Sequence, residues 1–497
     1  MTDTSGLTRL RRLLAGRAPK LMRDLAVLTS GQFVTKLIAV GAFAFLARTL
    51  DPEGYGAVEY IVGLTALFAM AVDFGLGTIG VKRIAESRNE LPTLAAQIPL
   101  ARLGIALLAI PILIIVAAAL GSPSIPLELV WLYAASLIFV ACNQDWLLQS
   151  EELMAHVAFA HMLRVLTFTV AVLLLVQGSA DVAAVGGAEL AAAAVVTLYY
   201  LLVTHIKVTP LRVPHSAFGM MGLLRESASL GLSRFAWAAA QYMPLFLVGT
   251  LVGGAQVGWF AAAQRLVTSI STFSFVYHFN LYPALARVSA VSSSELTDLM
   301  RVSFRVTGWA SIGLAFGLTL AASPIVTTIF GGRFEAAAPA LTILVWVIPV
   351  TFVSGHARWA LIVAGAQRHV LYSQIIGLVA IVLAGVPLVL LWNDVGAAVA
   401  GVTGAIAVWI VSHTYAMRLA AQPPGLMLLA RPLLLAVILG MAVQSTAMMP
   451  LVQAIIGCTF FAAVAPFVDR SLLSDLMQLA HAKATVVQPR KTSVPPS

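Results

Sequence analysis

Long apolar stretches separated by short polar connections make up most of this chain. Each stretch is about 19–29 residues long, enough at 1.5 Å per residue for an α-helix to cross a hydrocarbon layer of ~30 Å. We predict fourteen helical spans, at about 25–47, 57–80, 94–119, 127–149, 155–177, 181–204, 227–251, 256–284, 303–327, 336–363, 370–392, 395–417, 428–446 and 450–468.

Two polar connections divide the spans into three groups. Six spans precede a basic connection at about 205–226, six follow it, and two come after a break at 422–425. Six spans per half give both halves the same orientation, as in transporters built from parallel repeats. We therefore predict an all-α integral membrane protein with two six-helix bundles and a C-terminal helix pair. Its predicted parts are a basic N-terminus (1–24), an N-lobe (25–215), a C-lobe (216–420), the helix pair (421–468) and a tail (469–497).

Composition supports membrane residence. Sixty per cent of the residues are hydrophobic and ten per cent are charged, whereas soluble domains carry about 25% charged residues. The net charge is +9, but the basic residues gather in the connections of one side, and only Arg48 and Arg333 lie in those of the other. This asymmetry predicts that both termini are cytoplasmic, and it makes nucleic-acid binding an unnecessary explanation of the charge.

Other motifs exclude several functions. The two cysteines, Cys142 and Cys458, fall in separate spans and predict neither a disulfide framework nor a metal site. Residues 75–80 match G-x-G-x-x-G, but a dinucleotide site needs a strand before the motif. We interpret these glycines as a site of close helix packing. No Walker A motif is present, so we expect no ATP-driven pump and no cofactor.

Basic side chains within the spans are the strongest chemical signal. A charge at such depth costs several kcal/mol unless it faces water, a partner or the bundle interior. Lys36 and Arg265 lie ~13–16 Å from the nearest span ends by helix rise, and we expect both to line a hydrated cavity that binds an anion. Arg234 shares a helix face with Trp237 and Gln241, and we expect all three to line the same cavity. Three further arginines lie nearer the cytoplasmic span ends and either join this cavity or extend toward the interface: Arg102, Arg164 and Arg358.

Acidic residues within the spans are fewer. Glu189 and Arg164 lie on consecutive antiparallel spans at depths that differ by only ~5 Å, so we expect an ion pair. That pair is either a fixed structural link or a protonatable site that couples transport to H+ or Na+. Asp73 and Asp145 lie near the cytoplasmic span ends, where we expect inner-gate or structural ion pairs.

Several stretches resemble one family of transporters. They are residues 50–56 (LDPEGYG), 72–77 (VDFGLG) leading to 82–85 (KRIA), 257–265 (VGWFAAAQR), 330–339 (FGGRFEAAAP) and 394–398 (DVGAA). Over about 25–420 the chain resembles the polysaccharide repeat-unit (Wzx-type) flippases of the multidrug/oligosaccharidyl-lipid/polysaccharide exporter superfamily. The resemblance implies two six-helix bundles around a central cavity. Its basic residues would correspond to Lys36, Arg234 and Arg265, and less closely to Arg102, Arg164 and Arg358.

The resemblance also implies a substrate and a setting. The substrate would be a polyprenyl-diphosphate-linked oligosaccharide, carried from the cytoplasmic to the outer leaflet of the bacterial inner membrane for surface polysaccharide synthesis. Membrane lipids, a polysaccharide polymerase and chain-length machinery would be its partners. We expect alternating access driven by an ion gradient, with Glu189 as the candidate coupling site.

Three other functions can be weighed against that of a polysaccharide repeat-unit flippase. A multidrug antiporter of the same superfamily is disfavoured because the first span carries Lys36 with no acid near it. A flippase for a peptidoglycan precursor stays open. A membrane polymerase or glycosyltransferase is disfavoured because the outer connections are too short to hold its reactive residues, so we expect a transporter and not an enzyme.

Overall fold

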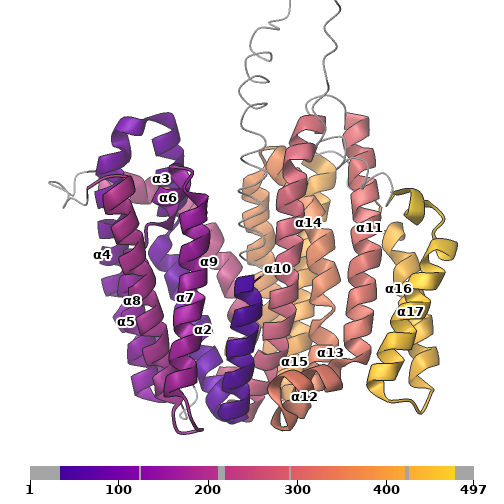
Figure 1. Ribbon diagram of the computed structural model, residues 1–497. Helices are drawn as coiled ribbons and strands as arrows, with labels where there is room; N and C mark the ends of the chain where they lie inside the picture. Colours follow the sequence, from indigo (N-terminus) through magenta and orange to yellow (C-terminus); the bar gives the residue numbers. More distant parts are fainter. Residues whose placement is uncertain (1–33, 122–124, 211–218, 290–292, 420–424, 476–497) are drawn as a thin grey trace, which may run out of the picture. The chain divides into compact units, whose positions relative to one another are not determined.

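The computed structural model describes residues 34–121, 125–210, 219–289, 293–419 and 425–475, all of them in helices, turns or connections (Figure 1). The chain forms two compact units, Met1–Ala261 and Ala262–Ser497. The basic N-terminus predicted at 1–24, the centre of the basic connection (211–218) and most of the tail lie outside the described residues.

The first unit is a bundle of long helices that pack on their neighbours. It begins with a helix over 34–49, which precedes α2. Helix α8 packs on both α5 and α7, and α9 packs on α2. Its elements are α2 (Pro52–Asp73), α3 (Leu76–Glu86), η1 (Arg88–Glu90), α4 (Leu91–Leu120), α5 (Leu127–Ala141), α6 (Asp145–Ser150), α7 (Met154–Leu175), α8 (Val182–Lys207), α9 (Met220–Leu251) and the first turns of α10 (Ala255–Ser289).

The second unit is built around α14. This helix packs on α11 and α15, and the C-terminal pair α16 and α17 packs on α11 (Figure 1). Besides the rest of α10, its elements are α11 (Ser293–Leu320), α12 (Ala322–Phe330), η2 (Gly332–Ala337), α13 (Ala338–Leu344), α14 (Val347–Val363), α15 (Gln367–Leu419), α16 (Met427–Gln444) and α17 (Pro450–Val468).

The predicted all-α, multi-pass membrane fold is confirmed. Within the described residues, nine helices are long and apolar enough to span a membrane, or ten if α11 and α12, bent by 72°, count as one span. Helices α9 and α10 also lie at predicted spans but are more polar. A break at Trp392 and Asn393 divides α15 into the two spans predicted at 370–392 and 395–417.

Local sequence explains how α2 begins and ends. Asp51 caps it, because its carboxylate accepts a hydrogen bond from the Gly54 backbone N–H at 2.7 Å. Pro52 takes the first helical position, where no intrahelical N–H is needed. At the other end Phe74 and Gly75 adopt φ of 47° and 76°, which separates α2 from α3. The span predicted at 57–80 runs through this break, so the prediction of one continuous helix there is wrong.

Helix α9 belongs by its contacts to the first unit, because it packs on α2, α3 and α4. The compact unit therefore extends past residue 215, where the sequence analysis ends the N-lobe. The domain ranges themselves stay a prediction.

Candidate functional site

Three charged residues from three helices meet in the first unit. Arg102 of α4 and Arg234 of α9 each form an ion pair with Asp73, the last residue of α2. Arg234 Nη1 donates to Asp73 Oδ2 at 2.8 Å, and Arg102 donates to the other carboxylate oxygen. We call these residues the Asp73 cluster. It brings together one predicted gate residue and two predicted cavity residues.

Glycines let the helices approach closely enough to form the cluster. A Cβ on Gly77 would lie 2.7 Å from Arg102 Nη2 and 3.1 Å from Trp146 Cβ, so only glycine leaves room for both side chains. A Cβ on Gly231 of α9 would lie 2.6 Å from the Phe74 carbonyl oxygen. The interpretation of residues 75–80 as a packing motif is confirmed, since Gly80 likewise lies against Trp146.

The two arginines of the cluster differ in exposure. The Arg102 side chain is 5% exposed, and its Nη1 also donates to the Asn143 carbonyl oxygen at 3.0 Å. Arg102 is thus held among the helices of the first unit, and its place in the cavity stays a prediction. The Arg234 side chain is 43% exposed and also donates to Thr78 Oγ1 at 3.0 Å. Two guanidinium groups share one carboxylate, so the cluster carries a net positive charge whose exposed part is Arg234.

The residues predicted beside Arg234 extend along the same helix. Trp237 and Gln241 follow it on α9 at positions three and seven residues later, which lie on one helix face. Trp237 is 45% exposed and Gln241 is half-buried. An exposed cation, an aromatic ring and an amide thus follow one another on one strip of α9.

The ion pair predicted between Arg164 and Glu189 is confirmed: Arg164 of α7 donates to the carboxylate of Glu189 on α8. Other ion pairs join helix ends. Arg83 Nη2 lies 2.5 Å from Glu226 Oε2, linking α3 to α9. The predicted gate residue Asp145 lies in the first turn of the short helix α6. Its gate role and the coupling role of Glu189 stay predictions.

The other predicted cavity residues lie on helices that contribute no residue to the Asp73 cluster. Lys36 is exposed on the helix over 34–49. In the second unit, Arg265 of α10 and Arg358 of α14 are half-buried. One turn after Arg265, Ser269 Oγ donates to the Arg265 carbonyl oxygen at 2.7 Å, so this hydroxyl is bonded within its own helix.

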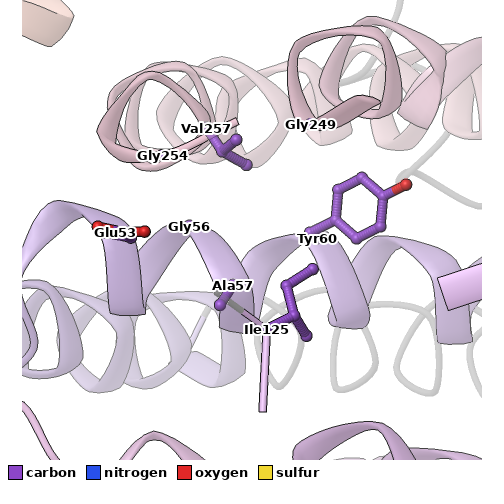
Figure 2. A pocket seen from close by; sticks show the side chains of 8 residues that line it. All are labelled: Glu53, Gly56, Ala57, Tyr60, Ile125, Gly249, Gly254 and Val257. Atoms are coloured by element: carbon purple, nitrogen blue, oxygen red, sulfur yellow. The ribbon is translucent and has the colours of Figure 1, made fainter. Parts of the chain in front are cut away.

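A small pocket opens between α2 and the α9–α10 turn (Figure 2). Figure 2 shows the Tyr60 ring of α2 directed toward Gly249 of α9, where a Cβ would lie 2.3 Å from the ring. The Tyr60 hydroxyl donates to the Leu120 carbonyl oxygen at 3.2 Å. The pocket is therefore a by-product of glycine-mediated packing, and it is too small for an oligosaccharide.

Sequence reasoning missed a second polar cluster, in the second unit. His278 of α10 and His356 of α14 are each 1% exposed and hydrogen-bond to one another. The available signal was a histidine in each of the spans predicted at 256–284 and 336–363. Within the described residues, no group of three or more His, Cys, Asp or Glu side chains could hold a metal ion.

Comparison with known proteins identifies relatives of this chain. A family model described as "Polysaccharide biosynthesis protein" matches residues 21–289. A protein of Escherichia coli (strain K12) named "Putative O-antigen transporter" is 21% identical over 331 residues, which cover 65% of this chain and 79% of that protein.

Solved structures share the fold. The lipid II flippase MurJ, in an inward closed conformation, superposes with a TM-score of 0.71 at 11% identity, covering 90% of this chain and all of MurJ. An inward-facing multidrug resistance transporter of the MATE family superposes with a TM-score of 0.63 at 16% identity, covering 80% of this chain and 98% of its own. At these identities the likeness concerns the fold alone.

Proposed function

The chain belongs to the polysaccharide biosynthesis protein family and is a multi-pass membrane transporter, and from that premise we propose that it flips a polyprenyl-diphosphate-linked oligosaccharide. Movement runs from the cytoplasmic to the outer leaflet of the bacterial inner membrane, with both termini in the cytoplasm. The product feeds surface polysaccharide synthesis, where a polymerase and chain-length machinery would receive it.

The observation that carries this proposal is the net positive charge of the Asp73 cluster. When such a lipid is flipped, its diphosphate and sugars must cross the hydrocarbon core of the membrane. Its prenyl tail can stay in that core throughout. The diphosphate crosses at lower cost if a cation replaces part of its hydration. Arg234 offers such a cation, because its side chain is 43% exposed while Asp73 and Thr78 hold its guanidinium in place.

Neighbouring side chains suit the sugars. Trp237 and Gln241 lie along the same helix as Arg234, and aromatic faces and amides are the usual protein contacts of sugar rings and hydroxyls. Lys36, Arg265, Arg102, Arg164 and Arg358 would complete a cationic path in this proposal. We infer alternating access driven by an ion gradient and not by ATP, because the sequence carries no Walker A motif.

The test is the lipid that accumulates when the protein is depleted from its host. We expect a diphosphate-linked oligosaccharide to build up in the inner leaflet and to be cleared by wild-type protein. Arg234→Ala should clear it poorly, whereas Arg88→Ala should clear it normally, since Arg88 is a 77% exposed residue that pairs with Glu151 away from the cluster.

Two results would contradict the proposal. Accumulation of a peptidoglycan precursor would make the chain a flippase of a different diphosphate lipid. Drug resistance on overexpression without any change in glycolipids would identify a multidrug antiporter.

A further inference from the structure

A continuous line of hydrogen bonds crosses three helices of the second unit. It begins at Tyr277 on α10, passes through Ser303 on α11 and His356 on α14, and returns to α10 at His278. The successive distances are 2.7 Å from Tyr277 Oη to Ser303 Oγ, 2.8 Å from Ser303 Oγ to His356 Nε2, and 3.2 Å from His356 Nδ1 to His278 Nε2. Ser303 and both imidazole rings are buried, whereas Tyr277 is partly exposed.

The hydrogen bond between His278 and a backbone carbonyl fixes which atom donates in each of the other hydrogen bonds. His278 Nδ1 lies 2.7 Å from the Ser274 carbonyl oxygen, and a carbonyl can only accept, so this nitrogen carries the proton. His356 Nδ1 lies 3.1 Å from the Phe352 carbonyl oxygen, so it too carries its proton, which it donates to that carbonyl and to Nε2 of neutral His278. His356 Nε2 in turn accepts from the Ser303 hydroxyl, which accepts from Tyr277. The neutral pair therefore has one self-consistent arrangement of protons.

Packing holds the two rings in this arrangement. A Cβ on Gly355 would lie 2.3 Å from His278 Cε1, so glycine is what lets the ring of α10 lie against the backbone of α14. The two imidazole rings meet edge to face, with centroids 4.6 Å apart. Both nitrogens of each ring are thus occupied in a site that excludes water.

Few charged groups face the pair. Arg358 on α14 is close enough to interact electrostatically with His278, and Tyr277 and Ser303 are the other polar groups from α10 and α11. Within the described residues, the hydrogen-bond partners of the two rings are hydroxyl groups, backbone carbonyl oxygens and each other, and none of them is a carboxylate. An added proton would therefore raise the free energy of this arrangement, because its charge is buried near Arg358, and that cost would favour a rearrangement of the three helices.

We propose that His278 and His356 form the proton-binding site that couples transport to a proton gradient; this rests on the proposed flippase function. A proton enters from water at Tyr277, which passes its own hydroxyl proton to Ser303, and Ser303 passes its own to His356 Nε2. The net change is one proton gained and a His356 imidazolium, and both hydroxyl groups reverse direction. Protonation thereby changes the links among α10, α11 and α14, and release of the proton restores them.

The test measures flipping of a diphosphate-linked oligosaccharide in proteoliposomes, with and without an imposed pH difference. We expect the difference to stimulate the wild-type protein, and His356→Asn to lower the stimulated component by about fivefold or more, the range of typical coupling energies. Tyr277→Phe keeps the ring packing but removes the hydroxyl at which the proton enters, so we expect the same loss of stimulation. This second variant keeps the proposal testable if His356→Asn folds poorly. Tyr199→Phe is the matched control, because it removes a hydroxyl that lies 2.7 Å from His156 in the first unit.

A second readout needs no substrate. Nitrogen-15 spectra of histidine-labelled protein in nanodiscs should show the Nδ1–H tautomer on both rings, and one protonation event that shifts both and is lost in His356→Asn. If this event is present and the glycolipid is not flipped, the proposed function fails and the proton site stands. Full stimulation in both His356→Asn and Tyr277→Phe, or its loss only in Glu189→Gln, would overturn the proton site.

Discussion

At the scale of single residues, the environment of each embedded charge decides what it can do. Arg102 is buried and has two acceptors, so it serves chiefly to hold Asp73. Arg234 shares the same carboxylate but is half exposed, so it remains accessible to an anion. The same residue type therefore has a positioning role on α4 and a candidate binding role on α9.

Removing the shared carboxylate should destabilise the first unit. Asp73→Asn leaves the buried Arg102 without its counter-ion, and breaking a buried pair in this way costs about 3–5 kcal/mol. The Asp73 side chain is 21% exposed, which places the expected loss toward the lower end of that range. Thermal unfolding in detergent measures the effect.

Asp298→Asn is the matched control for this prediction. It breaks an exposed pair with Arg301 one turn away on α11, and such pairs contribute about 0–1 kcal/mol. Equal unfolding temperatures for the two variants would show that the Asp73 cluster does not stabilise the unit.

At the scale of helices, the apolar pattern predicted the spans well and their breaks poorly. The predicted span at 450–468 coincides with α17, because hydropathy reports membrane depth residue by residue. The break between α2 and α3 was missed, since Phe74 adopts a left-handed conformation that no apolar period signals. It is this break that places Asp73 at a helix end, within reach of Arg234.

Contacts between consecutive helices could be predicted from the sequence, whereas contacts between helices far apart in the sequence could not. The Arg164–Glu189 pair was predictable because its two helices are consecutive and antiparallel, so depth along each helix is enough to match them. Asp73 and Arg234 lie 161 positions apart, and His278 and His356 lie 78 apart. Pairing at such separations depends on how helices cross, which the sequence of one chain does not reveal.

A glycine-to-alanine substitution on α3, which adds one methyl group, tests how closely this helix packs on its neighbours. Gly77→Ala places a Cβ against Arg102 and Trp146, and overpacking of this kind typically costs about 1–3 kcal/mol. Gly104→Ala on α4 meets nothing within 4 Å and should be neutral or stabilising by up to about 1 kcal/mol, because alanine favours helix. Unfolding temperatures that move equally in both variants would contradict the packing role of Gly77.

At the scale of the whole molecule, two units carry different chemistry. The first has a net positive cluster, which we propose binds an anionic group, and the second has a buried histidine pair, which we propose takes up a proton. A flippase needs both functions, since substrate binding alone does not supply direction. Membership of the polysaccharide biosynthesis family supports a transport role in that synthesis.

The most direct test of the central claim is the initial rate at which purified protein in liposomes flips a fluorescent polyprenyl-diphosphate oligosaccharide. We expect Arg234→Ala to slow flipping about tenfold or more, since a hydrogen bond to a charged group contributes about 1.5–3 kcal/mol, with Arg234→Lys intermediate and Arg88→Ala unchanged. A wild-type rate in Arg234→Ala would contradict the account.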